Sequence, residues 1–455
     1  MTEPPLASLT AWVAPALGEG DLQAPAGARV FAAAALAERA SPAGDAPAPV
    51  LVVTATAREA EDLVDELGDV IAGADVALYP AWETLPHERL SPRSDTVGRR
   101  LAVLRRLVHA DPSPVRVVVA PVRSLLQPQV RGLADMAPVV LAVGDEFGLD
   151  TLVQQLADAA YVRVDLVERR GEFAVRGGIV DVFPPTEEHP LRVEFFGDEV
   201  EQIRPFAVAD QRSLANEARQ TLWAPPCREL LLTEEVRQRA AARAERNPGL
   251  REMLTKISEG HAVEGMESLA PVLTSGMEML VDLLPADARI LLCDPERIRA
   301  RAADLVATSE EFLQASWAAA SAGAEAPIDL SEASFHDLDD VLAGRTVTSV
   351  APFGLEDSVL RPVPAYRGDL DQAIVDVRHW LADGRRVAIV VPGHGQEQRT
   401  REWLAENDVA GVEVLCGELT EGLVGEGFAI VTHHDLVGQR TAERVDRTAL
   451  PSRRR

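Results

Sequence analysis

Short apolar runs alternate with helically spaced apolar residues in the first 120 residues, and this alternation restricts the fold more than any other sequence feature. Val50–Val53 form an unbroken aliphatic run that indicates a buried strand. Thr56 and Glu59 have the spacing of a capping box, which predicts the start of a helix. Further strands are expected at 76–79 and 115–120, with a helix over 97–108 between them. Strand, helix and strand in this order predict a parallel α/β sheet with helices on its faces.

The period of the apolar residues changes near Tyr161 from helical spacing to strict alternation. Alternation in 162–166, 173–175 and 191–195 predicts a small antiparallel β-rich domain. Helical patterns return from about Glu234, and a last α/β unit is expected, with a helix at 374–381 and strands at 387–391 and 428–432. The predicted fold class is α/β, in which a parallel-sheet domain is interrupted by a small antiparallel domain and followed by a further small α/β domain.

Charge and composition exclude several classes of protein. The formal net charge of -27 argues against a chain that binds nucleic acid over its whole surface, because phosphate neutralisation needs a basic footprint. Apolar runs stay shorter than the ~18 residues of a membrane span, so we expect a soluble, cytoplasmic protein without membrane contact. Three widely separated cysteines predict buried free thiols, without a disulfide framework or a CxxC metal site: Cys227, Cys293 and Cys416.

Lysine usage decides the question of ATP binding. A phosphate loop needs a glycine-rich turn and a lysine that reaches the β and γ phosphates. Residues 24–29, where such a loop would lie, hold one glycine and no Gly-Lys-Ser/Thr, and the only lysine, Lys256, lies in a helical pattern. The sequence therefore predicts no ATP site, no cofactor and no catalytic residue.

Other candidate sites have weaker support. Asp294 could hold a metal after the apolar run 289–293, but Pro295 follows it, which favours a helix N-cap. His394 stands between two glycines after the strand at 387–391, where α/β folds often bind ligands, although one Gly-x-Gly is a weak signal. A metal at 433–435 is disfavoured because adjacent strand residues point in opposite directions. We expect no Cys–His pair, no hydrolase motif and no metal.

The β-rich domain offers a surface rather than a catalytic site. If Val193 and Phe195 point inward, Arg192 and Phe196 share the outward face, and the same alternation places Arg176 outward. An outward phenylalanine flanked by arginines is typical of a protein-binding hot spot. The alternative is a solvated strand face with Phe196 under a loop.

Several stretches of the sequence resemble the bacterial transcription-repair coupling factor family, Mfd. These stretches are 79–92, 95–100, 170–178, 192–198, 265–269 and 294–297. The resemblance implies a UvrB-like N-terminal region: a degenerate motor domain interrupted by a β-rich domain, then a small α/β domain. The implied domains are 1–135 and 211–342 (UvrB-like), 136–210 (β-rich, UvrA-binding) and 343–455 (small α/β).

The resemblance also implies a partner and its contact residues. In the family the β-rich domain contacts UvrA, and matching that surface onto this chain selects Arg176, Arg192 and Phe196. UvrB has a phosphate loop and a long DNA-probing hairpin, whereas this chain has neither, with 79–99 in the hairpin's place. Contacts with RNA polymerase and DNA are expected only through family domains that lie beyond Arg455.

Two functions follow from these features. The first is a non-catalytic adaptor that recruits UvrA of nucleotide excision repair to stalled RNA polymerase. The alternative is a local DNA-binding module of a repair helicase, with a group of arginines on phosphates: Arg89, Arg93, Arg99, Arg100, Arg105 and Arg106. An active helicase subunit is disfavoured because Lys256 is the only lysine.

Overall fold

The computed structural model describes residues 4–18, 20–38, 48–85, 88, 90–110, 113–214, 218–321, 331–352, 354 and 358–438. By their contacts the residues group into two compact units. Unit 1 comprises Met1–Arg39, Asp62–Ala74 and Thr348–Arg455, and unit 2 comprises Ala40–Glu61 and Asp75–Val347. Among the described residues, no helix is both long enough and apolar enough to cross a membrane.

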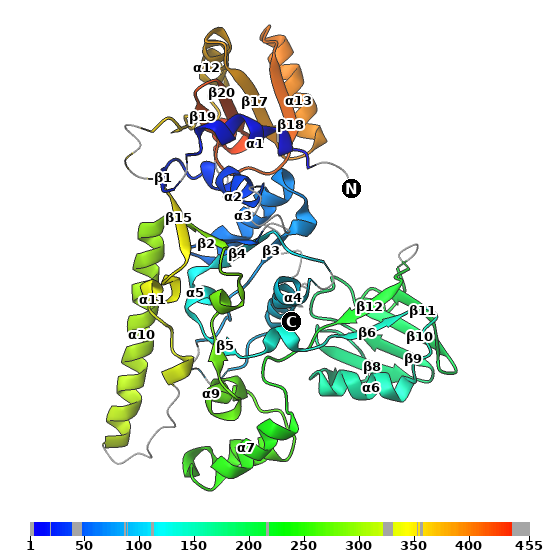
Figure 1. Cartoon of the computed structure of the whole chain (residues 1–455). Helices are drawn as coiled ribbons and strands as arrows, with labels where there is room; N and C mark the ends of the chain where they lie inside the picture. The colour runs from blue at the N-terminus through cyan, green and yellow to red at the C-terminus, as the bar shows by residue number, and fades with distance from the viewer. Residues whose placement is uncertain are drawn as a thin grey trace, which may run out of the picture. The chain divides into compact units, whose positions relative to one another are not determined.

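Unit 2 contains the predicted parallel sheet (Figure 1). Its strands pair side by side in the order β14 (Arg289–Cys293), β2 (Val50–Thr54), β4 (Val117–Pro121) and β3 (Val76–Leu78). Helices that contribute to its core include α4 (Ser94–His109), α5 (Val122–Leu126), α10 (Pro295–Ser321) and α11 (Leu338–Leu342). Every residue of β2 and β4 is buried, as expected for strands covered on both faces. The predicted strand, helix and strand order is confirmed.

Two predicted helix starts are confirmed by their hydrogen bonds. Before α3 (Ala57–Val70), the backbone N–H of Thr56 donates to Glu59 Oε2 at 3.1 Å, and the N–H of Glu59 donates to Thr56 Oγ1 at 3.3 Å. This is a reciprocal capping box. At the start of α10, the N–H of Arg297 donates to Asp294 Oδ1 at 3.3 Å, so Asp294 is an N-cap.

The β-rich domain, also in unit 2, is confirmed as an antiparallel sheet with one parallel edge pair. Its strands are ordered β11 (Glu199–Pro205), β10 (Leu191–Phe196), β9 (Ile179–Val182), β8 (Glu172–Arg176) and β7 (Val162–Arg163). One face packs on helix α6 (Leu149–Asp158) through a core that includes Leu152, Phe173, Val180, Val193 and Ile203. A two-stranded ribbon, β6 (Val139–Ala142) with β12 (Thr221–Ala224), adds to the same core.

A helical segment of unit 2 follows β12. It contains α7 (Glu234–Ala244), α8 (Arg251–Ser258) and α9 (Ala270–Leu273), with a separate small apolar core. Lys256 lies in α8 and pairs with Glu252, one turn earlier, at 2.7 Å. The helical interpretation of the segment around Lys256 is therefore confirmed.

Unit 1 contains the small α/β sheet that the sequence predicts near the end of the chain. The sheet order is β16 (Arg361–Pro362), β19 (Leu423–Gly425), β20 (Phe428–Thr432), β17 (Arg386–Val391) and β18 (Val412–Cys416). Helices α12 (Leu370–Ala382) and α13 (His394–Glu406) flank β17 in sequence. Unit 1 also contains α1 (Ala7–Val13), α2 (Ala28–Glu38) and a parallel pairing of β1 (Leu22–Gln23) with residues 350–351 of β15 (Thr346–Ala351).

Candidate protein-binding face of the β-rich domain

Two tight hairpin turns bring two of the predicted contact residues, Arg176 and Phe196, to one end of the sheet. Arg176 of β8 pairs with Ile179 across the turn Gly177–Gly178, and Ile179 pairs in turn with Glu194 of β10. Directly paired residues project from the same side of a sheet, so these three side chains share a face. The pairing of β10 with β11 shifts register between Glu194 and Phe195, but Phe195 packs against the core on the other face, so its neighbour Phe196 projects from the outer face.

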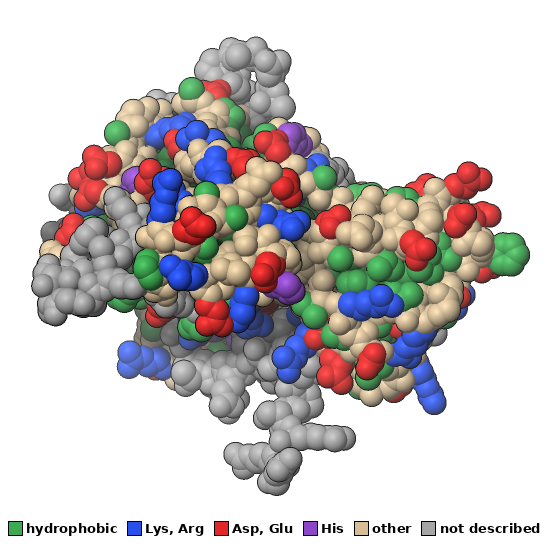
Figure 2. Space-filling model, turned by 90° about the horizontal axis from the view of Figure 1, so that it is seen from below, with side chains coloured by type: hydrophobic (Ala, Val, Ile, Leu, Met, Phe, Trp, Pro, Cys, Tyr) green, Lys and Arg blue, Asp and Glu red, His purple; other side chains and the backbone are tan. Residues whose placement is uncertain are grey.

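Phe196 is strongly exposed. Its side chain is 77% exposed, immediately before the two-residue turn Gly197–Asp198 that joins β10 to β11. The alternative that placed Phe196 under a loop is therefore wrong. Gly197 has a φ of 65°, in the left-handed region that favours glycine. Two-residue hairpin turns require this conformation. Figure 2 shows hydrophobic side chains gathered over the β-rich domain, at the right of the view, among basic and acidic ones.

Arg176 is also exposed, at the end of β8. Its guanidinium Nη2 donates one hydrogen bond, to the backbone carbonyl of Asp165 at 2.9 Å. An arginine guanidinium has five N–H donors, so one such bond leaves capacity for a partner's carboxylate or carbonyl. Arg176 and Phe196 thus combine a forked donor with an exposed ring at the same end of the sheet.

Arg192 projects from the predicted face, but most of its side chain is buried. Its Nε and Nη2 donate to the two carboxylate oxygens of Asp181 at 2.7 and 2.9 Å, and its guanidinium lies 4.8 Å from the centre of the Phe206 ring. Its Nη1 donates to the carbonyl of Gln211 at 3.4 Å. Only 18% of the side chain is exposed. The hydrogen bond that Arg192 donates to Asp181 raises the pKa of Arg192, so the guanidinium stays charged.

The burial of Arg192 has a physical cause that the strand pattern does not contain. A second small core lies on this face of the sheet, formed by Val167, Ala174, Phe183 and Phe206. Phe206 follows β11 and is fully buried. The expectation of a solvated outward face is therefore corrected: the outer face is covered around Arg192 and open around Arg176 and Phe196.

The arginines proposed for phosphate binding do not form one exposed group in the described part of the chain. Arg105 donates to the backbone carbonyl of Met136 at 3.2 Å, and Arg106 donates to that of Pro114 at 3.1 Å. Arg93 and Arg99 both pair with Asp95. Arg100 is fully buried. Arg89 lies outside the described residues.

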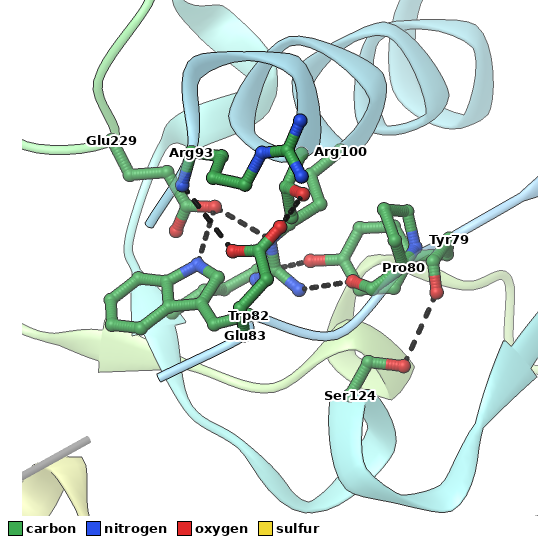
Figure 3. Close-up of polar contacts among 10 residues, drawn as sticks. Tyr79, Pro80, Trp82, Glu83, Arg93, Arg100, Ser124 and Glu229 are labelled. Atoms are coloured by element: carbon green, nitrogen blue, oxygen red, sulfur yellow. Dashed lines mark hydrogen bonds and ion pairs between the residues drawn. The ribbon is translucent and has the colours of Figure 1, made fainter. Parts of the chain in front are cut away.

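Arg100 instead fixes the start of the segment 79–99 (Figure 3). Its Nε donates to Glu229 Oε1 at 2.5 Å, and its Nη1 donates to the carbonyl of Pro80 at 3.0 Å. Trp82 Nε1 donates to the same Glu229 oxygen at 3.0 Å, and the Tyr79 ring lies 4.4 Å from the guanidinium. Burial opposes the charge on Arg100, but Glu229 outweighs it, so the pKa of Arg100 is raised. These contacts anchor the start of the segment 79–99 against α4 and Glu229.

In the loop between β1 and α2 of unit 1, where a phosphate loop would lie, two N–H groups already donate within the loop. The N–H of Ala28 donates to the carbonyl of Pro25 at 2.9 Å, and the N–H of Arg29 donates to that of Ala26 at 3.0 Å. A Cβ on Gly27 would lie 2.5 Å from the carbonyl oxygen of Glu421, so the turn packs closely against that backbone. A triphosphate needs inward-pointing N–H groups at this position.

Two expectations about metal-ligating residues are wrong. Residues 433–435 open helix α14 (His433–Val437), in which Asp435 forms a capping box with Thr432, so they do not lie on a strand. A Cys–His pair does exist: Cys416 Sγ lies 3.5 Å from His394 Nδ1. Cys227 and Cys293 are buried and not in a disulfide, as predicted, whereas Cys416 is half-buried.

Comparison with known proteins gives two results. The sequence model of the UvrB interaction domain family matches residues 139–225, which run from the start of β6 to just after β12. The chain is also similar to proteins named transcription-repair-coupling factor. Its sequence is 46% identical to those of Mycobacterium bovis and Mycobacterium tuberculosis over 92% of the chain, and 35% identical to that of Myxococcus xanthus over 61%. The chain spans 37% of the length of the mycobacterial relatives and 24% of the Myxococcus relative.

Proposed function

Because this chain corresponds to the N-terminal UvrB-like region of transcription-repair-coupling factors, we propose that it is a non-catalytic adaptor that recruits UvrA to stalled RNA polymerase. The proposed contact with UvrA is made by the β-rich domain. In this proposal RNA polymerase and DNA are engaged by other domains of those proteins.

The observation that carries the proposal is the exposed ring of Phe196 beside Arg176 at the open end of the sheet. Exposing a phenylalanine on a well-ordered strand has no benefit for folding, because the ring contributes little to the core of the domain. Aromatic and arginine side chains are the residue types enriched in binding hot spots. The match of residues 139–225 to the UvrB interaction domain supports the same domain as the binding unit.

Contacts in the loop before α2 support the proposal that this region does not bind or hydrolyse ATP. The N–H groups of Ala28 and Arg29 already donate within the loop, and the only lysine, Lys256, is paired with Glu252 in α8. A phosphate at this position would have to displace those bonds without a lysine to offset its charge.

The test is the affinity of purified UvrA for variants of the face, measured by calorimetry or by surface binding. We expect Phe196→Ala to weaken binding about thirtyfold, since truncating a hot-spot residue costs ~2 kcal/mol or more. Arg176→Glu should weaken it as well, because it reverses the charge offered to the partner. Val375→Ala, a smaller apolar truncation at an exposed position of α12, is the control and should bind normally.

Melting temperatures separate loss of binding from loss of folding. Phe196→Ala and Arg176→Glu should melt close to the original chain, because both side chains are exposed. Arg192→Glu is a poorer probe, since it would place a carboxylate against Asp181 and destabilise the domain. Normal binding by both Phe196→Ala and Arg176→Glu would place the UvrA contact elsewhere.

A further inference from the structure

A histidine, a glutamate and a cysteine meet at one edge of the small sheet of unit 1. Strands β17 and β18 run parallel, and Val391 at the end of β17 pairs with Cys416 at the end of β18. Helix α13 begins at His394, just after β17, and Glu397 lies one turn along the same helix face. The carboxyl edge of parallel strands is where α/β folds commonly place ligand-binding residues.

The three side chains converge through the atoms that bind metals. His394 Nδ1 and Glu397 Oε2 are 3.0 Å apart, Cys416 Sγ and the same Oε2 are 3.0 Å apart, and Sγ and Nδ1 are 3.5 Å apart. In a tetrahedral zinc site, with bonds of about 2.0 to 2.3 Å, neighbouring ligand atoms lie roughly 3.3 to 3.7 Å apart. The observed triangle is therefore close in size to one face of such a tetrahedron.

Neighbouring groups orient the carboxylate and keep the site open. Arg401 Nη2 lies 2.6 Å from Glu397 Oε1 and also donates to the carbonyl of Val414, which directs Oε2 toward the sulfur and the imidazole. Groups that fix a ligand in this way are typical of metal sites. The His394 side chain is 93% exposed, so the fourth position of a tetrahedron would face solvent.

We propose that His394, Glu397 and Cys416 form a binding site for a divalent transition-metal ion of the zinc class. One nitrogen, one oxygen and one sulfur ligand suit Zn²⁺ and Co²⁺, whereas Mg²⁺ and Ca²⁺ prefer oxygen ligands only. On binding, the thiol proton that Cys416 donates to Glu397 is released to solvent and the thiolate bonds to the metal. Three protein ligands with an open fourth position are typical of accessible sites rather than of closed structural ones.

The test is titration of the untagged, metal-free chain with Co²⁺, followed by displacement with Zn²⁺. A thiolate-bound Co²⁺ ion gives a sulfur-to-metal charge-transfer band, and a tetrahedral one gives intense visible bands. We expect both signals to saturate at one ion per chain and to disappear on addition of Zn²⁺. Mg²⁺ should not displace the Co²⁺.

Variants identify the ligands. Cys416→Ser should abolish the charge-transfer band, and His394→Ala should weaken binding at least about tenfold. His379→Ala is the control, since His379 is an exposed histidine of α12 that pairs with Asp383 and should leave the titration unchanged. Circular dichroism and melting temperature check that each variant is folded. The absence of a saturable thiolate band in the original chain, or an unchanged band in Cys416→Ser, would overturn the proposal.

Discussion

Removing the Glu229 carboxylate should destabilise unit 2 far more than an average substitution does. Arg100 is 0% exposed and Glu229 is 1% exposed, so the ion pair between them is fully desolvated. In Glu229→Ala the guanidinium keeps the carbonyl of Pro80 and the ring of Tyr79 but loses its counter-charge, and Trp82 Nε1 loses its acceptor. Breaking a buried pair from one side costs about 3 to 5 kcal/mol, and an unsatisfied buried donor costs a further ~1 to 3 kcal/mol.

These magnitudes predict a large and measurable change in stability. A loss of about 5 kcal/mol is a substantial part of the ~5 to 15 kcal/mol that typically stabilises a folded protein, and it corresponds to a drop of about 10 °C in melting temperature. Urea unfolding followed by tryptophan fluorescence is a suitable assay because Trp82 lies at the site. Glu229→Gln is the matched variant, since its amide oxygen can still accept from Trp82 and Arg100, so it should lose less than Glu229→Ala.

A double-mutant cycle tests whether Arg100 and Glu229 stabilise the fold as a pair. The pair Arg100→Met with Glu229→Leu replaces both charges by apolar groups of similar size, so it should lose much less stability than the sum of its two single variants, although Trp82 Nε1 still lacks its acceptor at a cost of ~1 to 3 kcal/mol. If the cost of Glu229→Ala is below ~1 kcal/mol, or if the single losses simply add in the double variant, the pair is not the anchor described above.

Two further outcomes are expected. Burial raises the pKa of Glu66 to about 7, so the folded chain holds this proton more tightly than the unfolded chain, and the free energy of unfolding falls as pH rises from about 4.5 to about 7. Glu66→Gln keeps an acceptor for Thr420 but does not titrate. Its free energy of unfolding, relative to that of the original chain, should therefore rise by up to about 3 kcal/mol between pH 4.5 and pH 8 in paired urea titrations. A pH-independent difference would contradict this. Calorimetric titration with ATP and Mg²⁺ should give no saturable heat, and a saturable signal in the purified chain would show that the loop before α2 can open.

Local patterns in the sequence predict much of this fold because the interactions that set it are local. The Thr56–Glu59 capping box and the Asp294 N-cap each involve residues three apart, so they are legible in the sequence. The alternation in β8 and β10 likewise assigns the direction of Arg176 and Phe196.

Contacts between distant residues have no comparable signal. Arg192 is covered because Phe206 and the carbonyl of Gln211 return over it, which alternation within one strand does not reveal. His394 and Cys416 belong to different elements and meet only because β17 and β18 pair in parallel register. Whether Arg176, Arg192 and Phe196 contact UvrA stays a prediction.

The two-residue turn after Phe196 has a consequence for the thermodynamics of association. A ring presented by a long loop loses conformational entropy when a partner immobilises it, whereas a ring on a strand closed by Gly197–Asp198 has lost most of that freedom during folding. Such a preorganised ring leaves more of its burial energy available as net affinity. Binding through Phe196 also depends on the register of β10. A shift of β10 by one residue would turn Phe196 to the opposite side of the sheet, away from any partner.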